Sequence, residues 1–298
     1  MRKQCIVFTL LYIMLSIAGY SQTANNSLLR VHYVFKHVAD TNFPDKPIVR
    51  SMQLDVSTRY SSFYLEKKEP AESKPETSGT TAPVARKRVM GMPSVMINSD
   101  PMAKEYLYQS IADKEMITIV SPGIGRYQIV SPLPVIKWKV QKTQKTIGTY
   151  TCQKATGSYG GRNYTAWFAP SLAFTYGPWK LNGLPGLILE ASDDQGHVSF
   201  VMEKITEGNE LFSLEDIRKS TKPLSEQEYE KAKQRFANDP VGTAKSSLPA
   251  GVADNIAIMY EDETGKILSG QEALEAIKAW SKKVINNPLE LQHPGAKH

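Results

Sequence analysis

Apolar and polar residues alternate over many short stretches of this chain, which is the pattern of half-buried β-strands. The clearest stretch is 28–38, where Val31, Tyr33 and Phe35 fall on one face and mostly polar residues on the other. Turn residues separate similar stretches, which predict further strands at 52–56, 62–65, 105–108, 116–120, 127–130, 136–140, 148–155, 164–168, 187–191 and 197–204. Strands at this spacing predict a mainly β fold, with a single curved antiparallel sheet or an open half-barrel.

The period of the apolar residues changes near residue 225. Ser225 and Glu228 have the spacing of a capping box, which predicts a charged helix that ends at about residue 238. In 271–285, apolar residues recur at spacings of three and four, which predicts a second helix. We therefore expect a helical C-terminal part from about residue 225, with its helices packed on the sheet or over its open face.

The first 21 residues have the composition of a secretory signal peptide. A basic Arg2-Lys3 pair precedes an apolar run over 6–18, and small residues follow at Gly19 and Ser21. This run is shorter than the roughly 20 residues that span a membrane, so we expect cleavage before Gln22 rather than an anchor. Residues 22–298 then form a single domain without a transmembrane segment, in the periplasm or outside the cell.

Composition adds few constraints. Residues 67–88 consist mainly of Pro, Ser, Thr, Glu and Lys, which predicts a disordered loop inside the domain. The net charge of +6 is mild and the basic residues look dispersed, which argues against nucleic-acid binding. Cys152 is the one cysteine that remains after cleavage, so no internal disulfide forms, and we expect it to be buried. No pattern implies a cofactor.

Three turn signals lie close together near Gly183-Leu184-Pro185-Gly186. Pro185 presets φ for the second position of a type II turn, and Gly186 supplies the positive φ of the third position. An apolar run begins at Leu187. We interpret this motif as a rigid structural corner that directs a buried strand into the core.

Four residues are candidates for ligand binding. Trp138, Trp167 and Trp179 lie on or beside predicted strands near the corner. Aromatic residues favour strands, so an ordinary core is one interpretation, and the apolar lining of a ligand cavity is the other. Arg162 follows two glycines at a predicted hairpin. It either binds an acidic ligand or pairs with an internal carboxylate, for which Glu190 and Asp193 are available.

No catalytic or metal site is predicted. The five histidines lack the spacing of a zinc motif, and the chain has no hydrolase elbow, P-loop or dinucleotide fingerprint. A methionine cluster (Met90, Met92, Met96 and Met102) offers soft ligands for Cu(I), but no histidine or cysteine lies near it in the sequence. We therefore expect a protein that is not an enzyme.

A series of short motifs runs from Trp138 to Ser192, with one more near the C-terminus. They are Trp138, Ile147-Gly148, Tyr150, Cys152, Lys154-Ala155, Gly161-Arg162, Tyr164, Ala166-Trp167-Phe168, Gly177-Pro178-Trp179, Gly183-Leu184-Pro185-Gly186-Leu187-Ile188 and Asn287-Pro288-Leu289-Glu290-Leu291. In this order they resemble the GLPGLI family of secreted Bacteroidota proteins, although Phe168 stands where that family more often has tyrosine. The resemblance implies a location and a fold rather than an activity. The architecture also looks like the LolA-like lipoprotein carriers of the periplasm, in which an open half-barrel wraps a helix.

Three functional hypotheses follow. The leading one is a non-catalytic envelope protein that binds a hydrophobic small molecule, lipid or peptide segment in the concavity of the sheet. The second is an interaction or assembly module for outer-membrane proteins that uses sheet edges. The third is an unrecognised hydrolase. An apolar cavity would favour the first, an exposed edge without a cavity the second, and a cleft with acids, histidine and hydroxyl the third.

Overall fold

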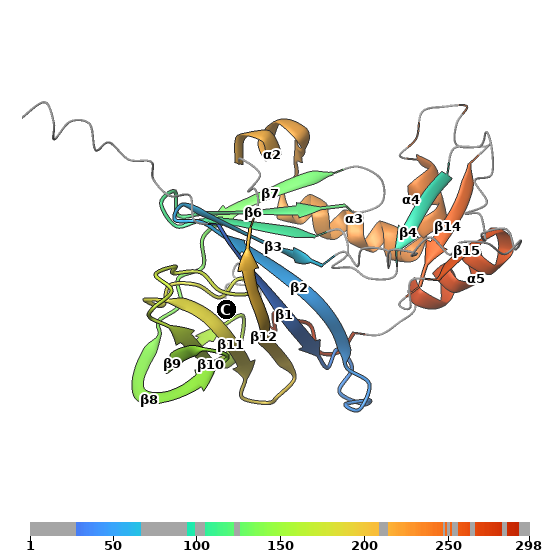
Figure 1. Ribbon diagram of the computed structural model, residues 1–298. Coiled ribbons are helices and arrows are strands. Elements are labelled where there is room, and N and C mark those ends of the chain that lie inside the picture. The colour runs from blue at the N-terminus through green and yellow to red at the C-terminus, as the bar shows by residue number, and fades with distance from the viewer. Residues whose placement is uncertain are drawn as a thin grey trace, which may run out of the picture.

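The computed structural model describes residues 28–66, 94–98, 105–121, 126–208, 214–246, 248, 251, 256–262, 266–281 and 285–291. The largest part of the fold is one large, curved, unclosed sheet (Figure 1). Its strands follow the order β13-β7-β6-β5-β3-β2-β1-β12-β11-β10-β9-β8. All neighbours pair antiparallel except β13 and β7, which are parallel. The predicted mainly β fold is confirmed.

The strands of this sheet are two to ten residues long, and short turns join several of the neighbouring pairs. They are β1 (Leu29–His37), β2 (Ile48–Val56), β3 (Tyr60–Leu65), β5 (Tyr106–Ser110), β6 (Glu115–Val120), β7 (Tyr127–Pro132), β8 (Lys139–Ile147), β9 (Tyr150–Tyr159), β10 (Arg162–Ala169), β11 (Leu187–Asp193), β12 (Val198–Glu207) and β13 (Lys222–Pro223). The strand predicted at 136–140 is misplaced. Residues 133–138 have no regular structure, and β8 instead runs through the polar residues that follow.

The main core lies on the concave side of the sheet. Side chains from β1 and β12 meet there, with the rings of Phe35 and Phe200 stacked 5.0 Å apart. The segment 170–186, which links β10 to β11, fills the concavity: the Tyr33 hydroxyl donates to the carbonyl of Ile188 just after it, at 2.5 Å. Burial of this apolar surface, at roughly 25 cal/mol per Å², is the main force that holds the curved sheet around the segment.

Helix α2 (Leu214–Ser220) covers part of the opposite face of the sheet. Its Ile217 packs against Tyr108, Ile117 and Ile119 of β5 and β6. Strand β13 follows directly and pairs with the outer edge of β7. This end of the sheet is therefore capped.

A second, three-stranded sheet lies beside the first (Figure 1). It consists of β4 (Ser94–Asn98), β14 (Ala257–Glu261) and β15 (Ile267–Ser269), and β14 pairs with β4 in parallel. Helices α4 (Pro240–Ser246) and α5 (Gly270–Ser281) share a separate apolar core with it. The C-terminal part is thus not only helical as predicted, and α5 packs on this small sheet rather than on the large one.

The remaining helix, α3 (Glu226–Asn238), begins with the predicted capping box. Ser225 accepts a hydrogen bond from the backbone of Glu228, whose side chain accepts one from the backbone of Ser225. In Figure 1, α3 runs from the large sheet toward the small one. The predicted signal peptide (1–21), the predicted loop (67–88) and Met90, Met92 and Met102 lie outside the described residues; of Met96 only the backbone, in β4, is described.

Candidate functional site

The concave side of the sheet is occupied by the chain itself. In the segment 170–186, Tyr176, Leu181 and Leu184 are at most 2% exposed. The Tyr176 hydroxyl donates to the carbonyl of Arg59 at 2.7 Å, which ties the segment to the far half of the sheet. The place where a hydrophobic ligand was expected is therefore filled with the protein's own side chains.

Trp179 and Trp138 both contribute to this filling. The Trp179 ring stacks on Phe200 at 6.4 Å, and its carbonyl accepts a hydrogen bond from Gln109 Nε2 at 2.5 Å. Trp179 also adopts a φ of +54°, which is strained for a residue with a large side chain. Trp138 donates through Nε1 to the carbonyl of Asn182 at 2.8 Å. Trp179 is thus part of the core and Trp138 packs against it, which agrees with one of the two interpretations of the sequence.

Trp167 lies on the other face of the sheet. It is only partly buried, and Lys145 Nζ lies 4.5 Å above its ring, in cation–π geometry. The same ammonium pairs with Glu190 at 2.7 Å. The structure therefore does not bring the four candidate ligand residues together, and their role in binding stays a prediction.

The motif Gly183-Leu184-Pro185-Gly186 forms a corner, but not a type II turn. The N–H of Gly186 donates to the carbonyl of Leu184 at 2.8 Å, which closes a three-residue γ-turn around Pro185. Gly186 has a φ of +154°, and a Cβ there would lie 2.4 Å from the carbonyl oxygen of Ala169. Glycine is needed at this position because the backbones approach so closely. Leu187 then begins β11, as predicted.

Arg162 is the best-connected polar residue of the interior. Its side chain is 2% exposed, and Nη1 donates to Asp193 Oδ2 at 2.7 Å, a carboxylate that is fully buried. The pairing with an internal carboxylate, one of the two alternatives from the sequence, is therefore present. Buried charges need partners of this kind, because removing an ion from water costs several kcal/mol.

The other donors of Arg162 hold the C-terminal strap, by which we mean residues 285–291. The guanidinium donates to the carbonyls of Leu289 (3.0 Å) and Pro288 (2.6 Å) and to Asn287 Oδ1 (2.6 Å). His37 Nε2 donates to the carbonyl of Asn287 at 2.7 Å. The strap thus joins the end of β1 to the β9–β10 hairpin, and sequence analysis missed it because most of its acceptors are backbone carbonyls.

Strand β8 forms the other end of the large sheet, and its outer edge is open. Among the described strands it pairs only with β9. A two-residue turn joins the two strands, and in it Gly148 has the φ of +57° that a type II′ turn requires at its first position. In such a hairpin Ile147 and Tyr150 bond to each other, so Thr146 and Gln144 direct their N–H and C=O groups away from β9. Within the described residues, no backbone group of another segment bonds to this edge.

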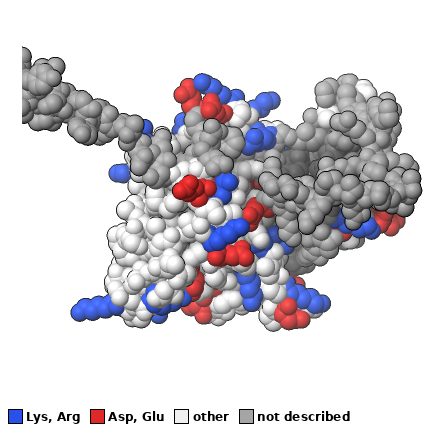
Figure 2. Space-filling model, viewed as in Figure 1, with Lys and Arg blue, Asp and Glu red and all other residues white. Residues whose placement is uncertain are grey.

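The surroundings of β8 carry positive charge. Lys137, Lys139 and Lys142 are exposed, and none of them forms an ion pair within the described part of the chain. In Figure 2, the surface over β8–β10 is mostly white, with blue side chains at its lower edge. Two shallow depressions flank the hairpin strands: one is lined by Gln144 and Thr151 among others, the second by Lys137 and Asn163 among others.

One sequence signal for this surface was overlooked. Between Glu115 and Glu190 the chain has no aspartate or glutamate. The same stretch has eight basic residues, namely Arg126, Lys137, Lys139, Lys142, Lys145, Lys154, Arg162 and Lys180. The positive charge is therefore more concentrated than the net charge suggested, because acidic residues elsewhere in the chain offset it.

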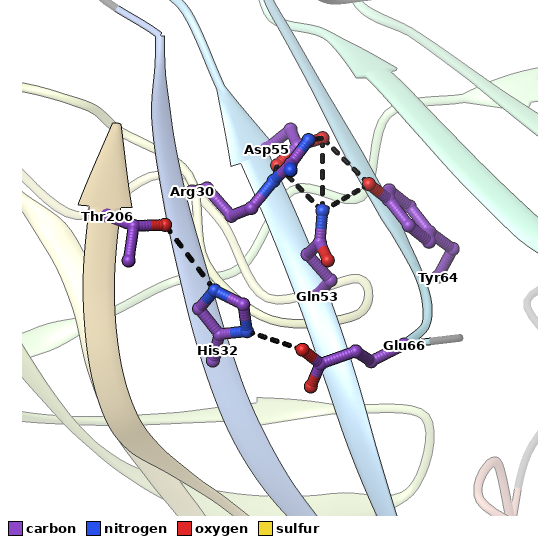
Figure 3. A network of polar contacts seen from close by, with 7 residues as sticks. All are labelled: Arg30, His32, Gln53, Asp55, Tyr64, Glu66 and Thr206. Carbon is purple, nitrogen blue, oxygen red and sulfur yellow. Dashed lines mark hydrogen bonds and ion pairs between the residues drawn. The ribbon is translucent and has the colours of Figure 1, made fainter. Parts of the chain in front are cut away.

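The convex face of β1, β2 and β3 carries a polar network (Figure 3). Asp55 is its centre: it accepts two hydrogen bonds from Arg30, at 2.8 and 3.1 Å, and others from Gln53 and Tyr64. The hydrogen bond to Asp55 raises the pKa of Arg30, and burial raises that of Tyr64. Because these groups satisfy one another, the network stabilises the pairing of three strands.

A second chain of contacts in Figure 3 has the residue types of a hydrolase. His32 contacts Glu66 Oε1 through Nδ1 at 2.9 Å and Thr206 Oγ1 through Nε2 at 3.4 Å. The second distance is long for a hydrogen bond to a nucleophile. Thr206 is exposed on a sheet face, and neither of the two depressions near β8 includes it. These two depressions therefore give the hydrolase hypothesis no support.

Other candidate chemistry is sparse in the described part of the chain. No group of three or more His, Cys, Asp or Glu is placed there to hold a metal ion. Cys152 is buried, as predicted, and burial raises the pKa of its thiol. No helix among the described residues has the length and apolar character to cross a membrane.

Comparison with known proteins gives little further information. No family model matches the chain, and no curated protein does. Among solved structures, those of PNGF-II in space groups P21 and C2 are similar, with TM-scores of 0.49 and 0.48 and sequence identities of 11% and 12%. Each match covers 70% of this chain and 33% of PNGF-II. The chain therefore spans about a third of the length of that protein.

Proposed function

We propose that this protein is a non-catalytic interaction module that takes up an extended segment of another polypeptide as an added strand on β8. The observation that carries this proposal is the open outer edge of a nine-residue strand at the end of a large sheet. Such an edge presents a row of unpaired N–H and C=O groups, which is a template for another strand.

The contrast between the two ends of the sheet supports this proposal. At the other end, β13 covers β7, and it is only two residues long and contains Pro223, which has no N–H to offer. Natural proteins protect edges in this way. At β8 the protection is partial, since no backbone group in the described part of the chain bonds to the outward N–H and C=O groups of Gln144 and Thr146.

The filled concave side also supports edge binding over binding of a hydrophobic ligand. A ligand there would have to displace Tyr176, Leu181 and Leu184, which are almost completely buried. Each large side chain of this kind contributes about 1.5–3 kcal/mol by burial, so displacement of several would cost more than a small ligand returns. The interior is suited to holding the sheet rigid.

Secretion to the periplasm or the cell exterior remains part of this proposal, as does membership of the GLPGLI family. The signal-peptide pattern over 1–21 supports the first, and the ordered motifs from Trp138 to Ser192 support the second. Service to an outer-membrane protein is one form that the interaction would take.

The experiment uses three labelled ten-residue peptides in which threonine alternates with glutamate, glutamine or lysine. Binding is measured by fluorescence anisotropy, and hydrogen exchange of the full chain locates it. We expect at least one peptide to protect the amides of Gln144 and Thr146 from exchange. The variant Thr146→Pro should abolish the protection of the Gln144 amide, because proline removes an outward N–H without removing a bond to β9.

The control is Thr146→Ala, which removes the same side chain but keeps the N–H. It should bind as the unchanged protein does, and both variants should unfold at similar urea concentrations. If none of the three peptides protects β8, or if Thr146→Pro binds as well as Thr146→Ala, strand addition at this edge is refuted.

A further inference from the structure

We infer that the segment bound by β8 is acidic; this inference rests on the proposed function and specifies its partner. The first observation is the stretch between Glu115 and Glu190, which has no acidic residue and provides the whole β7–β10 part of the sheet. An approaching anionic segment meets no repulsive side chain from this stretch. Such one-sided surfaces raise association rates with partners of opposite charge.

The second observation is the exposure of the lysines. Lys137 and Lys139 flank Trp138, whose indole bonds to the carbonyl of Asn182, and both lysines are exposed. Lys142 is exposed in the irregular part of β8, between Val140 and Gln144, where the register with β9 shifts. Lys139 and Lys142 thus lie on β8 and Lys137 just before it, where Asp194 lines the same depression. None of the three lysines forms an ion pair in the described part of the chain.

Lysines on an edge strand also repel unwanted partners. They disfavour pairing with apolar or basic strands, which is a common protection against aggregation. An acidic strand is the one partner for which the same lysines become attractive, because residues opposite each other on neighbouring strands lie about 4.5–5.5 Å apart at Cβ. The lysines thus disfavour pairing with apolar or basic strands and favour pairing with acidic ones.

The backbone of β8 distinguishes a polypeptide from other polyanions. The outward groups of Gln144 and Thr146 include both N–H donors and C=O acceptors. A strand offers both kinds of partner, whereas the phosphate or sulfate groups of nucleic acids and polysaccharides offer only acceptors. The chemistry of the edge therefore favours an acidic polypeptide.

The experiment compares the same three peptides, with heparin as a polyanion that cannot pair with a strand. We expect the glutamate peptide to bind about tenfold more tightly than the glutamine peptide at 50 mM NaCl, and the lysine peptide to bind most weakly. At 500 mM NaCl the difference should almost disappear, because the Debye length falls to only a few Å.

Matched variants test the lysines directly. Replacing Lys137, Lys139 and Lys142 by glutamine should lower the affinity for the glutamate peptide about eightfold, a factor of about two for each exposed lysine–glutamate pair. The affinity for the glutamine peptide should not change. The control replaces Lys36, Lys204 and Lys231 by glutamine. These lysines are exposed elsewhere on the protein and carry the same total charge, so their loss should leave the affinity for the glutamate peptide unchanged.

Each outcome has a distinct meaning. If the glutamine peptide protects Gln144 and Thr146 as well as the glutamate peptide does, strand addition stands and the preference for acidic segments is refuted. If no peptide protects β8, the proposed function fails, and this inference fails with it. If heparin displaces the glutamate peptide and the Thr146→Pro variant binds that peptide normally, the surface is a general polyanion site and the inference of an acidic strand is overturned.

Discussion

Replacement of Arg162 by lysine tests whether the C-terminal strap is held from the interior of the sheet. The guanidinium donates to one carboxylate and to three acceptors of the strap. Lysine keeps the positive charge but has a single nitrogen, which cannot reach four acceptors arranged around a planar fork. We therefore expect the ion pair with Asp193 to survive and the strap to detach.

The size of the effect follows from these contacts. If the strap stayed in place, up to three buried acceptors would lose their partner, at about 1–3 kcal/mol each. Detachment limits this loss, because the carbonyls then bond to water, but it also gives up the contacts of His37 with Asn287 and of Leu289 with the core. We expect a loss of about 2–4 kcal/mol in the free energy of unfolding.

Urea unfolding measures this loss, and hydrogen exchange shows where it arises. In the unchanged protein, the N–H of Asn287 donates to the carbonyl of Ala39 and that of Leu291 to the carbonyl of Gly160, so both amides should exchange slowly. In Arg162→Lys both should exchange fast, while β1 and β10 stay protected. A double-mutant cycle with Asn287→Ala should give a coupling of about 1–3 kcal/mol.

The control is Arg30→Lys on the convex face. Arg30 also holds a carboxylate, Asp55, but its side chain is 27% exposed and both of its hydrogen bonds within the described residues go to Asp55 rather than to the strap. The variant Arg30→Lys should lower the free energy of unfolding by at most about 1 kcal/mol and leave the strap amides protected from exchange. If Arg162→Lys also leaves those amides protected and the stability unchanged, Arg162 does not hold the strap.

Two further predictions concern the corner and the strap. Gly186→Ala should destabilise the protein more than Gly183→Ala does, because a Cβ at position 186 would meet the backbone of Ala169. Gly183 has a φ of +92° and open space around it, so its replacement should cost only about 1–2 kcal/mol of backbone strain, and equal losses in thermal unfolding would contradict this. Burial lowers the pKa of His37, aided by the charge of Arg162 and opposed by the hydrogen bond to Asn287. Below pH 6.5, His37 therefore binds a proton in the unfolded chain but stays neutral in the folded one. The free energy of unfolding should fall as the pH drops, by up to about 1.4 kcal/mol per pH unit. Urea unfolding at pH 7.5 and 5.5 checks this, and His37→Gln should remove that part of the pH dependence; an unchanged dependence would exclude His37 as its source.

Alternation in the sequence predicted the strands that have one buried face. Strand β1 is such a case, since Val31, Tyr33 and Phe35 are buried as expected. Strand β8 has no buried face, so its residues Lys139–Ile147 show no alternation and resemble a loop. The small sheet was missed for another reason: β14 pairs with β4, which lies far away in the sequence, and each of the two is only five residues long.

The candidate sites likewise differ in how much signal they leave in the sequence. The pair of Arg162 with Asp193 was among the expected alternatives, because an internal arginine needs a carboxylate and Glu190 and Asp193 follow the Gly183-Leu184-Pro185-Gly186 corner. The strap could not be predicted, because the carbonyls of Pro288 and Leu289 have no side-chain signal. The basic edge was readable in principle, from the absence of acidic residues between Glu115 and Glu190, but only a local count of charges reveals it.

Binding at the open edge of β8 depends on a rigid interior. A strand can add to β8 with little loss of affinity only if β8 is already held in an extended shape, since ordering it on binding would cost about 1–2 kcal/mol per residue. Strand β9 provides that order, because its Cys152 and Ala155 are fully buried in the core and fix its position. The Trp138 indole anchors the entry to β8 through the carbonyl of Asn182, on the segment that fills the concavity. A loosened interior should therefore weaken binding at β8 even though no interior residue touches the added strand.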